Sequence, residues 1–289
     1  MLKKYVWPFL KASESIVGLN HRNFRLIYKL NNRFDYQLAN DKIKAKDFLN
    51  CIKVPTSQTY QIYRGLYDLR NIVDDLKNYA SFVVKPAKGS RGNGILILEQ
   101  SEKGKYRSLS GKQYNPSELK YFIASIIFGK FSMGHQDHAL IEKKLIPDSR
   151  IRALSYGGFA DIRILFAREK LILAMLRLPT KTSDGKANLH QGGIGVGVDL
   201  KSGITTQAIF KNHLITKHPD IDAPLIGVQI PDWHRLIKIS NLIAQKCPLK
   251  YIGIDLILEE NDGPVVIEFN ARPGLEIQNA NQIGILEHL

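Results

Sequence analysis

Near its C-terminus the chain reads Tyr251-Ile-Gly-Ile-Asp-Leu-Ile-Leu-Glu-Glu-Asn-Asp-Gly-Pro-Val-Val-Ile-Glu-Phe-Asn-Ala-Arg-Pro-Gly-Leu-Glu276. Two runs of strand-forming residues, GIDLILE and PVVIEFN, flank an Asp262-Gly263 pair, which is a strong signal for a β-hairpin. If Asp262 and Gly263 form a two-residue turn, Asp255 lies opposite Asn270, with Glu268 on the diagonal. This stretch therefore predicts a hairpin that gathers three oxygen-bearing side chains.

The three polar side chains of this hairpin suit a metal ion. Glu268 and Asn270 are two residues apart and share one strand face, whereas a slip of one residue would move Asp255 to the other face. Carboxylate and amide oxygens are the hard ligands that suit Mg²⁺ carried with phosphates. The alternative is a hairpin with polar residues on its solvated face. Because the strands are otherwise apolar, a carboxylate-rich cluster among them is costly without a partner, which favours the metal site.

The composition indicates a soluble globular protein with a strongly basic balance. Of the 289 residues, 44% are hydrophobic and 24% are charged, which allows one large domain or two to three subdomains. The net charge of +14 implies anionic partners such as nucleotide phosphates, an acidic peptide, nucleic acid or a membrane surface. The positive charge is spread along the chain, so a generally lysine-rich surface is the alternative.

The cysteines and the apolar runs lead us to expect a cytoplasmic protein. Cys51 and Cys247 are isolated, without metal or redox spacing, which fits a reducing compartment. The opening MLKKYVWPFLK is interrupted by Pro8 and Lys11 and is too short for a signal peptide. No run approaches the ~18 apolar residues of a membrane span.

The apolar periodicity predicts a mixture of helices and strands. Basic and apolar residues alternate over residues 1–50, which indicates a mostly helical N-terminal region. Further helices are expected over residues 66–79, over 118–129 behind a Ser117 cap, and up to Lys246 behind an Asp232 cap. Strands are expected at residues 59–63, 81–85, 95–98, 139–142, 161–167 and 171–178, with the last two forming a hairpin.

A glycine-rich loop, KGSRGNG, occupies residues 88–94, just after the expected strand that ends at Lys85. Glycines let backbone amides approach a phosphate closely, and Lys85, Lys88 and Arg91 add positive charge. The loop is not a P-loop, because no Lys-Ser or Lys-Thr pair ends it and a strand follows it. We interpret it as a flap over a triphosphate, with an ordinary glycine-rich hairpin as the alternative.

The order of these motifs resembles the ATP-grasp superfamily, most closely the α-L-glutamate ligase-related proteins, from about Asn20 to the C-terminus. The resemblance implies an α+β chain with the ATP-grasp fold, in which two α+β subdomains clasp ATP behind a short, mostly helical N-terminal region. The expected domains are the helical region (1–50), a subdomain with the phosphate flap (51–134) and a C-terminal subdomain with the metal site (135–289). The implied cofactors are ATP and Mg²⁺, with two ions expected and Mn²⁺ as an alternative.

By this resemblance, one set of residues is implied to bind the nucleotide. The lysines of Asn40-Asp-Lys-Ile-Lys and Phe82-Val-Val-Lys-Pro are similar to the family's phosphate-binding lysines, and residues 140–145 resemble its adenine-binding hinge. The full set is Lys42, Lys85, Gly89, Ser90, Arg91, Gly92, Gly94, Glu142, Lys143, Leu145, Asp161 and Arg163.

The resemblance also implies metal ligands and catalytic residues. The metal ligands are Asp255, Glu268 and Asn270. The catalytic residues, which contact or orient the reacting groups, are Arg177, Asn188, Arg272 and Glu276.

Three of the polar residues in the middle of the chain have a second interpretation. Arg163 and Arg177 lie between apolar neighbours on expected strands, where an arginine can bind a carboxylate or an acyl phosphate through two hydrogen bonds. A surface arginine on a solvated sheet face is the alternative. His190 is interpreted as a hydrogen-bonding loop residue rather than a proton shuttle.

The implied reaction joins a carboxylate to an amine. The carboxylate attacks the γ-phosphorus of ATP to give an acyl phosphate, and the amine then displaces phosphate to form an amide. Closure of the flap would protect the acyl phosphate from water. The expected partners are ATP, a small-molecule or peptide carboxylate, and an acidic amine acceptor, with glutamate suggested only by the family label.

Two other functions are compatible with the sequence. A kinase of the same fold, acting on a polyanionic hydroxyl substrate, would use the same metal ligands and the basic charge. A non-catalytic nucleic-acid-binding protein would need only the basic surface. No clear aromatic–basic recognition motif is present, so nucleic acid is not the expected partner.

Overall fold

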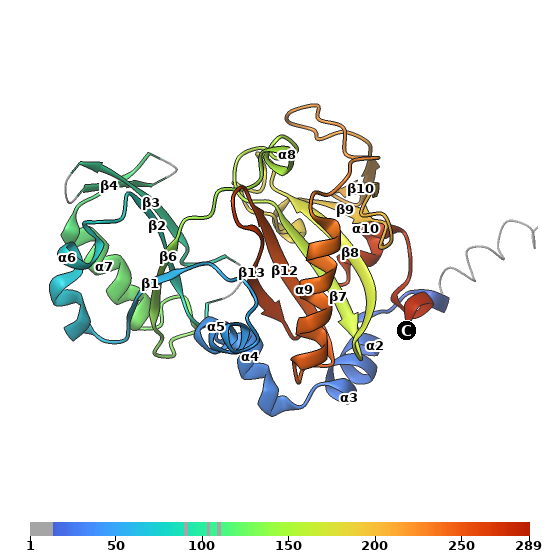
Figure 1. Cartoon of the computed structure of the whole chain (residues 1–289), viewed down its shortest axis with the longest axis horizontal. Coiled ribbons are helices and arrows are strands. Elements are labelled where there is room, and N and C mark those ends of the chain that lie inside the picture. The colour runs from blue at the N-terminus through green and yellow to red at the C-terminus, as the bar shows by residue number, and fades with distance from the viewer. Residues whose placement is uncertain (1–13, 90–91, 103–104, 109–110) are drawn as a thin grey trace, which may run out of the picture. The chain divides into compact units, whose positions relative to one another are not determined.

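The computed structural model describes residues 14–89, 92–102, 105–108 and 111–289. The chain divides into two compact units (Figure 1). The described part of unit 1 comprises residues 14–39, 45–55 and 146–289, and unit 2 comprises residues 40–44 and 56–145. In chain order, unit 2 is therefore inserted into unit 1. The expected three-part division at residues 50 and 134 stays a prediction.

Unit 2 is built on a six-stranded antiparallel sheet with the order β1-β6-β2-β3-β4-β5. Its strands are β1 (Thr59–Tyr63), β2 (Ser81–Pro86), β3 (Leu96–Glu102), β4 (Lys105–Ser108), β5 (Gln113–Tyr114) and β6 (Ala139–Lys143). Its helices are the 3₁₀-helix η3 (Leu66–Asn71), α6 (Ile72–Leu76) and α7 (Pro116–Ile127). Alternate residues of β2, Phe82 and Val84, are fully buried and share one core with Leu119 and Ile123 of α7.

Two helices of unit 2 differ from the sequence-based expectation. Helix α7 begins two residues earlier than expected, because Asn115 and not Ser117 caps it: Asn115 accepts from the Glu118 amide (3.0 Å) and Glu118 accepts from the Asn115 amide (2.9 Å). The span expected as a single helix over 66–79 is divided into η3 and α6, because Asn71 leaves the helical conformation (φ −103°, ψ 15°).

Unit 1 is built on a seven-stranded antiparallel sheet with the order β11-β10-β9-β8-β7-β12-β13. Its strands are β7 (Asp161–Ala167), β8 (Lys170–Leu178), β9 (Ile194–Val198), β10 (Thr205–Phe210), β11 (His213–Ile215), β12 (Tyr251–Glu259) and β13 (Gly263–Asn270). After unit 2 its helices are α8 (Ser149–Arg152), η4 (Leu189–Gln191), α9 (Trp233–Lys246), α10 (Glu276–Asn281) and η5 (Ile285–His288). Together the two units confirm the expected α+β class.

Helix α10 lies directly on β9, because β9 alternates glycine with valine or isoleucine. A Cβ atom at Gly197 would lie 2.6 Å from the Ala280 carbonyl oxygen, and one at Gly195 would lie 3.2 Å from the Ala280 Cβ. Gly195 pairs with Arg177 of β8, and directly paired residues point to the same side of a sheet. Helix α10 therefore packs on the sheet face that carries Arg177.

The N-terminal segment of unit 1 is helical, as expected. It contains α2 (Leu19–His21), the π-helix η1 (Arg22–Ile27), α3 (Tyr28–Leu30), the 3₁₀-helix η2 (Arg33–Tyr36), most of α4 (Gln37–Asn40) and, after residues 40–44 of unit 2, the remainder of α5 (Lys42–Cys51). The buried Asn31 side chain accepts from the amides of Lys250 and Tyr251 (2.8 Å each) and donates to the Tyr251 carbonyl (2.8 Å). The C-terminus lies beside α2 in Figure 1, where Ser15 donates to Glu287 (2.9 Å).

The described residues contain no helix that is both long enough and apolar enough to cross a membrane.

Candidate functional site

The strand register of unit 1 brings six predicted site residues onto one face of the sheet. Asp255 of β12 pairs with Glu268 of β13 on one side and with Arg163 of β7 on the other. On the next rung of the sheet, Asp161 of β7 pairs with Arg177 of β8. Asn270, two residues beyond Glu268, pairs with Gly253 and completes the set. These strands are far apart in the sequence, so the cluster exists only when the whole sheet is formed.

The register of the β12–β13 hairpin differs from the expected one. Near its turn, Glu259 pairs with Gly263, so the two strands are joined by three residues rather than by the expected two-residue turn. A β-bulge then interrupts the ladder, and Ile267 is left without a partner. Asp255 is consequently opposite Glu268, and not opposite Asn270 as expected. The shared face is still formed, because the bulge shifts the alternation of β13 by one residue.

Asp255 is completely buried and is held by two arginines. Arg163 donates to both carboxylate oxygens through Nε (2.7 Å) and Nη2 (2.6 Å), and Arg177 donates through Nη2 (2.7 Å). Burial by itself would raise the pKa of Asp255, but the charges of Arg163 and Arg177 outweigh burial and hold the pKa well below its usual range. Asp255 is therefore a permanent buried anion.

Asp161 has the opposite behaviour, although it also contacts Arg177. Arg177 Nε donates to Asp161 at 2.5 Å. Burial raises the pKa of Asp161, the charge of Arg177 lowers it and the nearby Asp255 anion raises it, with the result that the pKa is about 6. Burial would lower the pKa of Arg177, but Asp161 and Asp255 raise it above its ordinary value. Both arginines thus balance internal carboxylates in this structure, and their predicted contacts with a substrate or a phosphate stay predictions.

The donor set at β13 fits a magnesium ion. Glu268 and Asn270 are partly exposed, and the Asn270 amide group donates to Asp255 (3.2 Å) and Glu268 (3.3 Å), which leaves its amide oxygen available as a ligand. In the described part of the chain, no three His, Cys, Asp or Glu side chains form a metal cluster, so an amide oxygen is needed in the set. Mg²⁺ takes one or two carboxylates together with waters and substrate phosphates. Glu268 and Asn270 would hold the ion, with Asp255 behind them, and the three ligand assignments stay predictions.

In unit 2, the predicted nucleotide-binding lysines lie around the root of the glycine-rich loop. Lys85 on β2 forms an ion pair with Glu142 on the neighbouring β6 (2.7 Å). The Lys42 ammonium group donates to the Gly89 carbonyl (2.7 Å), and the Lys42 amide donates to the Ala87 carbonyl (2.9 Å). The structure therefore brings Lys42 and Lys85 to β2 and to the start of the predicted flap.

The hinge residues continue β6. The Lys143 amide donates to the Gln58 carbonyl (2.9 Å), and its own carbonyl accepts from Ser57 (3.2 Å). Leu145 is buried. Contacts of this segment with an adenine base stay a prediction.

A buried carboxylate that the sequence did not single out holds the root of the glycine-rich loop. Asp137 is fully buried and accepts from the Lys88 amide (3.0 Å), from the His138 amide (2.7 Å) and from the Ser132 hydroxyl. At the far end of the loop, a Cβ atom at Gly94 would lie 2.6 Å from the Phe131 ring. The segment around residues 131–137 thus supports both ends of the loop. No spacing rule distinguishes Asp137 from an ordinary loop aspartate.

The residues of the glycine-rich loop are described in part. Gly89, Gly92 and Gly94 are described, and Gly92 and Gly94 have φ values of +73° and +76° that favour glycine. Ser90 and Arg91 lie outside the described residues.

The predicted catalytic residues Asn188, Arg272 and Glu276 lie outside the strands of unit 1. Glu276 begins α10 and contacts the exposed His190 (Nε2–Oε1 2.7 Å), for which the sequence indicates only a loop role. Asn188 caps the turn before β9 by accepting from the His190 amide (3.1 Å). The Arg272 guanidinium lies over the Tyr36 ring at 5.5 Å. His190 and Glu276 are therefore neighbours from distant parts of the chain, and the catalytic roles of Asn188, Arg272 and Glu276 stay predictions.

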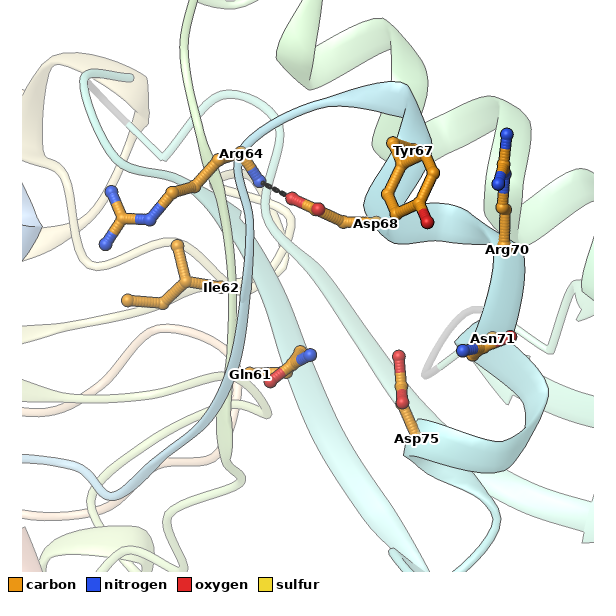
Figure 2. Close-up of a pocket in the computed structure, with 8 residues that line it drawn as sticks. All are labelled: Gln61, Ile62, Arg64, Tyr67, Asp68, Arg70, Asn71 and Asp75. Atoms are coloured by element: carbon orange, nitrogen blue, oxygen red, sulfur yellow. Dashed lines mark hydrogen bonds between the residues drawn. The ribbon is translucent and has the colours of Figure 1, made fainter.

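A pocket of about 580 Å³ in unit 2 contains none of the predicted site residues (Figure 2). It is lined by Gln61, Ile62, Arg64, Tyr67, Asp68, Arg70, Asn71 and Asp75. Its acidic side chains have structural partners, because Asp68 accepts from the Arg64 amide (2.7 Å) and Asp75 accepts from the Tyr63 hydroxyl (3.0 Å). Arg70 lies over the Tyr67 ring at 4.0 Å, and the two side chains stand side by side in Figure 2.

Related proteins align with almost the whole chain. A protein named probable alpha-L-glutamate ligase from Legionella pneumophila is 25% identical over 286 residues, covering 97% of this chain and 72% of that protein. A protein of the same name from Pseudomonas putida is 24% identical over 294 residues, covering 98% of this chain and 75% of that protein. These names agree with the predicted enzyme class, an ATP-dependent ligase that forms carbon–nitrogen bonds.

Two solved structures share the fold of this chain. The D-alanyl-alanine synthetase A of Vibrio cholerae matches with a TM-score of 0.52 at 10% identity, over 87% of this chain and 62% of that chain. The phosphoribosylamine–glycine ligase of Thermotoga maritima matches with a TM-score of 0.51 at 15% identity, over 87% of this chain and 53% of that chain. This chain thus spans less than two thirds of either structure.

The expected ATP-grasp fold is confirmed by these likenesses, and ATP and Mg²⁺ are the cofactors that ATP-grasp ligases use. A sequence profile described as sugar-transfer associated ATP-grasp matches residues 21–289. The chain therefore belongs to the sugar-transfer associated ATP-grasp family.

Proposed function

We propose that this chain is an ATP-dependent carboxylate–amine ligase that forms an amide through an acyl phosphate. The observation that supports the proposal is the polar face of unit 1, where Glu268 and Asn270 stand partly exposed beside the buried Asp255. Such a set offers oxygen ligands at the surface and a fixed negative charge behind them. That arrangement suits a metal that accompanies nucleotide phosphates.

The residues of the chain would act mainly by binding and by electrostatics. Mg²⁺ bound at Glu268 and Asn270 would neutralise charge on the β- and γ-phosphates. Arg163 and Arg177 keep Asp255 ionised and fix its orientation, so that the ligand side chains next to it keep their geometry. Lys42 and Lys85 carry positive charge to the loop that is predicted to cover the phosphates.

The substrates are proposed from the relatives. Their name points to glutamate as the amine or the carboxylate that is joined, and the net charge of +14 favours an acidic second substrate. Because the reaction consumes ATP, we place it in the cytoplasm. The proposal thus predicts an enzyme that activates a carboxylate and transfers it to a nitrogen nucleophile.

Hydroxylamine trapping tests this proposal. The full chain is incubated with ATP, Mg²⁺, L-glutamate and hydroxylamine, and both ADP and the iron(III)–hydroxamate complex are measured. A ligase gives hydroxamate in proportion to ADP, because hydroxylamine captures the acyl phosphate. A panel of other amino acids and acidic peptides, read by product mass, extends the test beyond glutamate.

Two results would contradict the proposal. Release of ADP with no hydroxamate from any carboxylate would mean that no acyl phosphate is formed. A stable phosphorylated product in place of an amide would identify a kinase on the same fold. The Glu268→Gln variant serves as the inactive control for every assay.

A further inference from the structure

The first 34 residues differ in composition from the rest of the chain. They contain seven of the basic side chains, namely Lys3, Lys4, Lys11, Arg22, Arg25, Lys29 and Arg33, against the single acid Glu14. Seven minus one gives a net +6, so about an eighth of the chain carries 6 of its 14 net charges. The same residues include six aromatic side chains. A segment that is both basic and aromatic points to a partner that offers both negative charge and an apolar surface.

The structure shows how the described part of this segment is oriented. In the helical run of α2, η1 and α3, the side chains of Leu26 and Ile27 lie in the core of unit 1, with exposed fractions of 4% and 1%. On the same inner side, Arg22 donates to the Pro273 carbonyl (3.2 Å). One side of this helical run is therefore fixed to the protein.

The other side of the run faces solvent. Phe24 and Tyr28, four residues apart, are 66% and 55% exposed, and their rings meet edge to face at 5.9 Å. The exposed basic residues His21, Arg25 and Lys29 flank them. We name this set of five residues the basic–aromatic face.

Three more exposed apolar residues are close in sequence to the basic–aromatic face. Ile16 and Leu19 are 55% and 63% exposed, and Phe34 is 76% exposed on the next helix. Five of the nineteen exposed large apolar side chains in the described residues therefore lie between positions 16 and 34. Single exposed apolar residues are ordinary, but several in one short segment that also carries exposed basic residues indicate an interaction surface.

We propose that the basic–aromatic face docks on a membrane surface that carries anionic lipid headgroups. Aromatic rings and aliphatic side chains enter the boundary between headgroups and acyl chains, while arginine and lysine remain with the negative headgroups. Nucleic acid could use the rings for stacking, but it gains nothing from Ile16 and Leu19, which have no flat face. Docking leaves Leu26 and Ile27 in the core, and it does not depend on the ligase activity.

Vesicle co-sedimentation tests this inference. The full chain is mixed with vesicles of phosphatidylcholine alone, or with vesicles that contain about 30% phosphatidylglycerol to supply negative charge. The wild type is expected to bind the anionic vesicles, to bind neutral vesicles at least about tenfold less, and to lose affinity at high salt. Both Phe24→Ser/Tyr28→Ser and Arg25→Glu/Lys29→Glu are expected to lower the affinity at least about tenfold.

A matched variant on another helix controls for general loss of surface aromatics. Tyr121 and Phe128, on and just after α7, are 75% and 68% exposed, so Tyr121→Ser/Phe128→Ser removes comparable side chains elsewhere. This variant is expected to bind vesicles like the wild type. Circular dichroism and thermal unfolding show whether each variant is folded, and the charge-reversal pair keeps the test valid if the serine pair is unstable.

Several results would overturn the inference. They are equal binding to neutral and anionic vesicles, no binding to either, and full binding by both variants of the basic–aromatic face. Binding of a single-stranded RNA oligonucleotide without binding of vesicles would assign the face to nucleic acid instead. A dimer in light scattering that disappears in Phe24→Ser/Tyr28→Ser, without vesicle binding, would assign it to self-association.

Discussion

Arg177 joins two carboxylates that respond differently to pH. Asp255 accepts two hydrogen bonds from Arg163 and one from Arg177. Asp161 accepts a hydrogen bond from Arg177 alone. The shared cation is not enough for two buried anions, so the pKa of Asp161 is raised to about 6 by burial and by repulsion from Asp255. The cluster can therefore take up one proton near neutral pH.

This difference predicts a pH-dependent stability. The raised pKa of Asp161 contributes stability that is fully present below the unfolded-state value of 3.8 and is lost as the pH rises through about 6. Relative to Asp161→Asn, the unfolding free energy of the wild type should fall by on the order of 3 kcal/mol between pH 4 and pH 7. Urea unfolding at several pH values measures this. A constant difference between the two proteins would contradict it.

Asp255→Asn is the matched variant. It removes the carboxylate that accepts from both Arg163 and Arg177 and leaves Arg177 with Asp161 alone, so it should destabilise the protein by about 3–5 kcal/mol at pH 7, in contrast to Asp161→Asn.

Glu268 should matter for metal use more than for stability. It is partly exposed at the surface of the cluster, so Glu268→Gln removes a carboxylate ligand and keeps its shape. ATP turnover should fall roughly 100-fold or more, and the Mg²⁺ concentration for half-maximal rate should rise, because a metal ligand is lost. ADP release measured over a series of Mg²⁺ concentrations checks this. Glu169→Gln, an exposed carboxylate that pairs with Lys250, should leave both values unchanged.

At the residue scale, the sequence predicted which side chains gather but not how they pair. Asp255, Glu268 and Asn270 stand within one hairpin, so local spacing was sufficient to place them together. The two arginines reach Asp255 from β7 and β8, whose neighbours in the sheet are set by the whole topology. Spacing along the chain contains no signal for such non-local ion pairs.

The bulge in β13 shows why the expected hairpin register was wrong. Val266 pairs with Leu256, and Phe269 pairs with Ile254, so both point to the core face although they are three residues apart. Regular alternation cannot place residues three apart on one face, and the unpaired Ile267 resolves the conflict. A two-residue turn at Asp262-Gly263 was the strongest local signal. The core requirement of Val266 and Phe269 overrode it.

The contact between α10 and β9 predicts a stability effect at a glycine. Gly197→Ala would place a methyl group 2.6 Å from the Ala280 carbonyl oxygen and 2.9 Å from the Asn281 side chain, so α10 must move away from the sheet. The cost should be about 1–3 kcal/mol, as for other overpacked core positions. The same shift moves Glu276, at the start of α10, away from His190. Thermal unfolding measures the first effect, and amide formation measures the second.

Gly65→Ala is the control for this prediction. A methyl group at Gly65 would have no other atom within 4 Å, and the φ of Gly65 is −153°, so alanine should fit without strain. Equal destabilisation by Gly65→Ala and Gly197→Ala would show that the close approach of α10 is not the cause.

At the scale of the whole molecule, Asn31 connects the first helices to the last strands. Its side chain exchanges hydrogen bonds with the backbone at Lys250 and Tyr251, as a neighbouring strand would. Asn31→Ala would leave the buried Tyr251 amide and the partly buried Lys250 amide without acceptors, which should cost about 2–4 kcal/mol. The adjacent and exposed Asn32→Ala should cost less than about 1 kcal/mol, because it removes only the cap of η2. Urea unfolding of both variants compares them.

The fold class and most strands could be predicted from the sequence, because their apolar patterns are local. The expected strand at residues 59–63 coincides with β1, and that at 161–167 coincides with β7. The association of the N-terminal helices with the C-terminal sheet could not be predicted from local patterns. Residues 14–39 fold with residues 146–289, and this association depends on contacts such as Val17 with Gln278 (2.8 Å), which are remote in sequence.

The insertion of unit 2 determines the order in which the nascent chain can fold. All residues of unit 2 have been synthesised once residue 145 is made, so this unit can complete its sheet while the ribosome continues. The N-terminal helices have left the ribosome long before, yet Leu26 and Ile27 belong to a core whose strands begin at residue 161. These two side chains remain uncovered until the last strands emerge. Unit 1 can therefore become stable only after β13, which ends at Asn270, has emerged, and a chain stalled between residue 145 and the strands of unit 1 would present exposed N-terminal helices to chaperones and proteases.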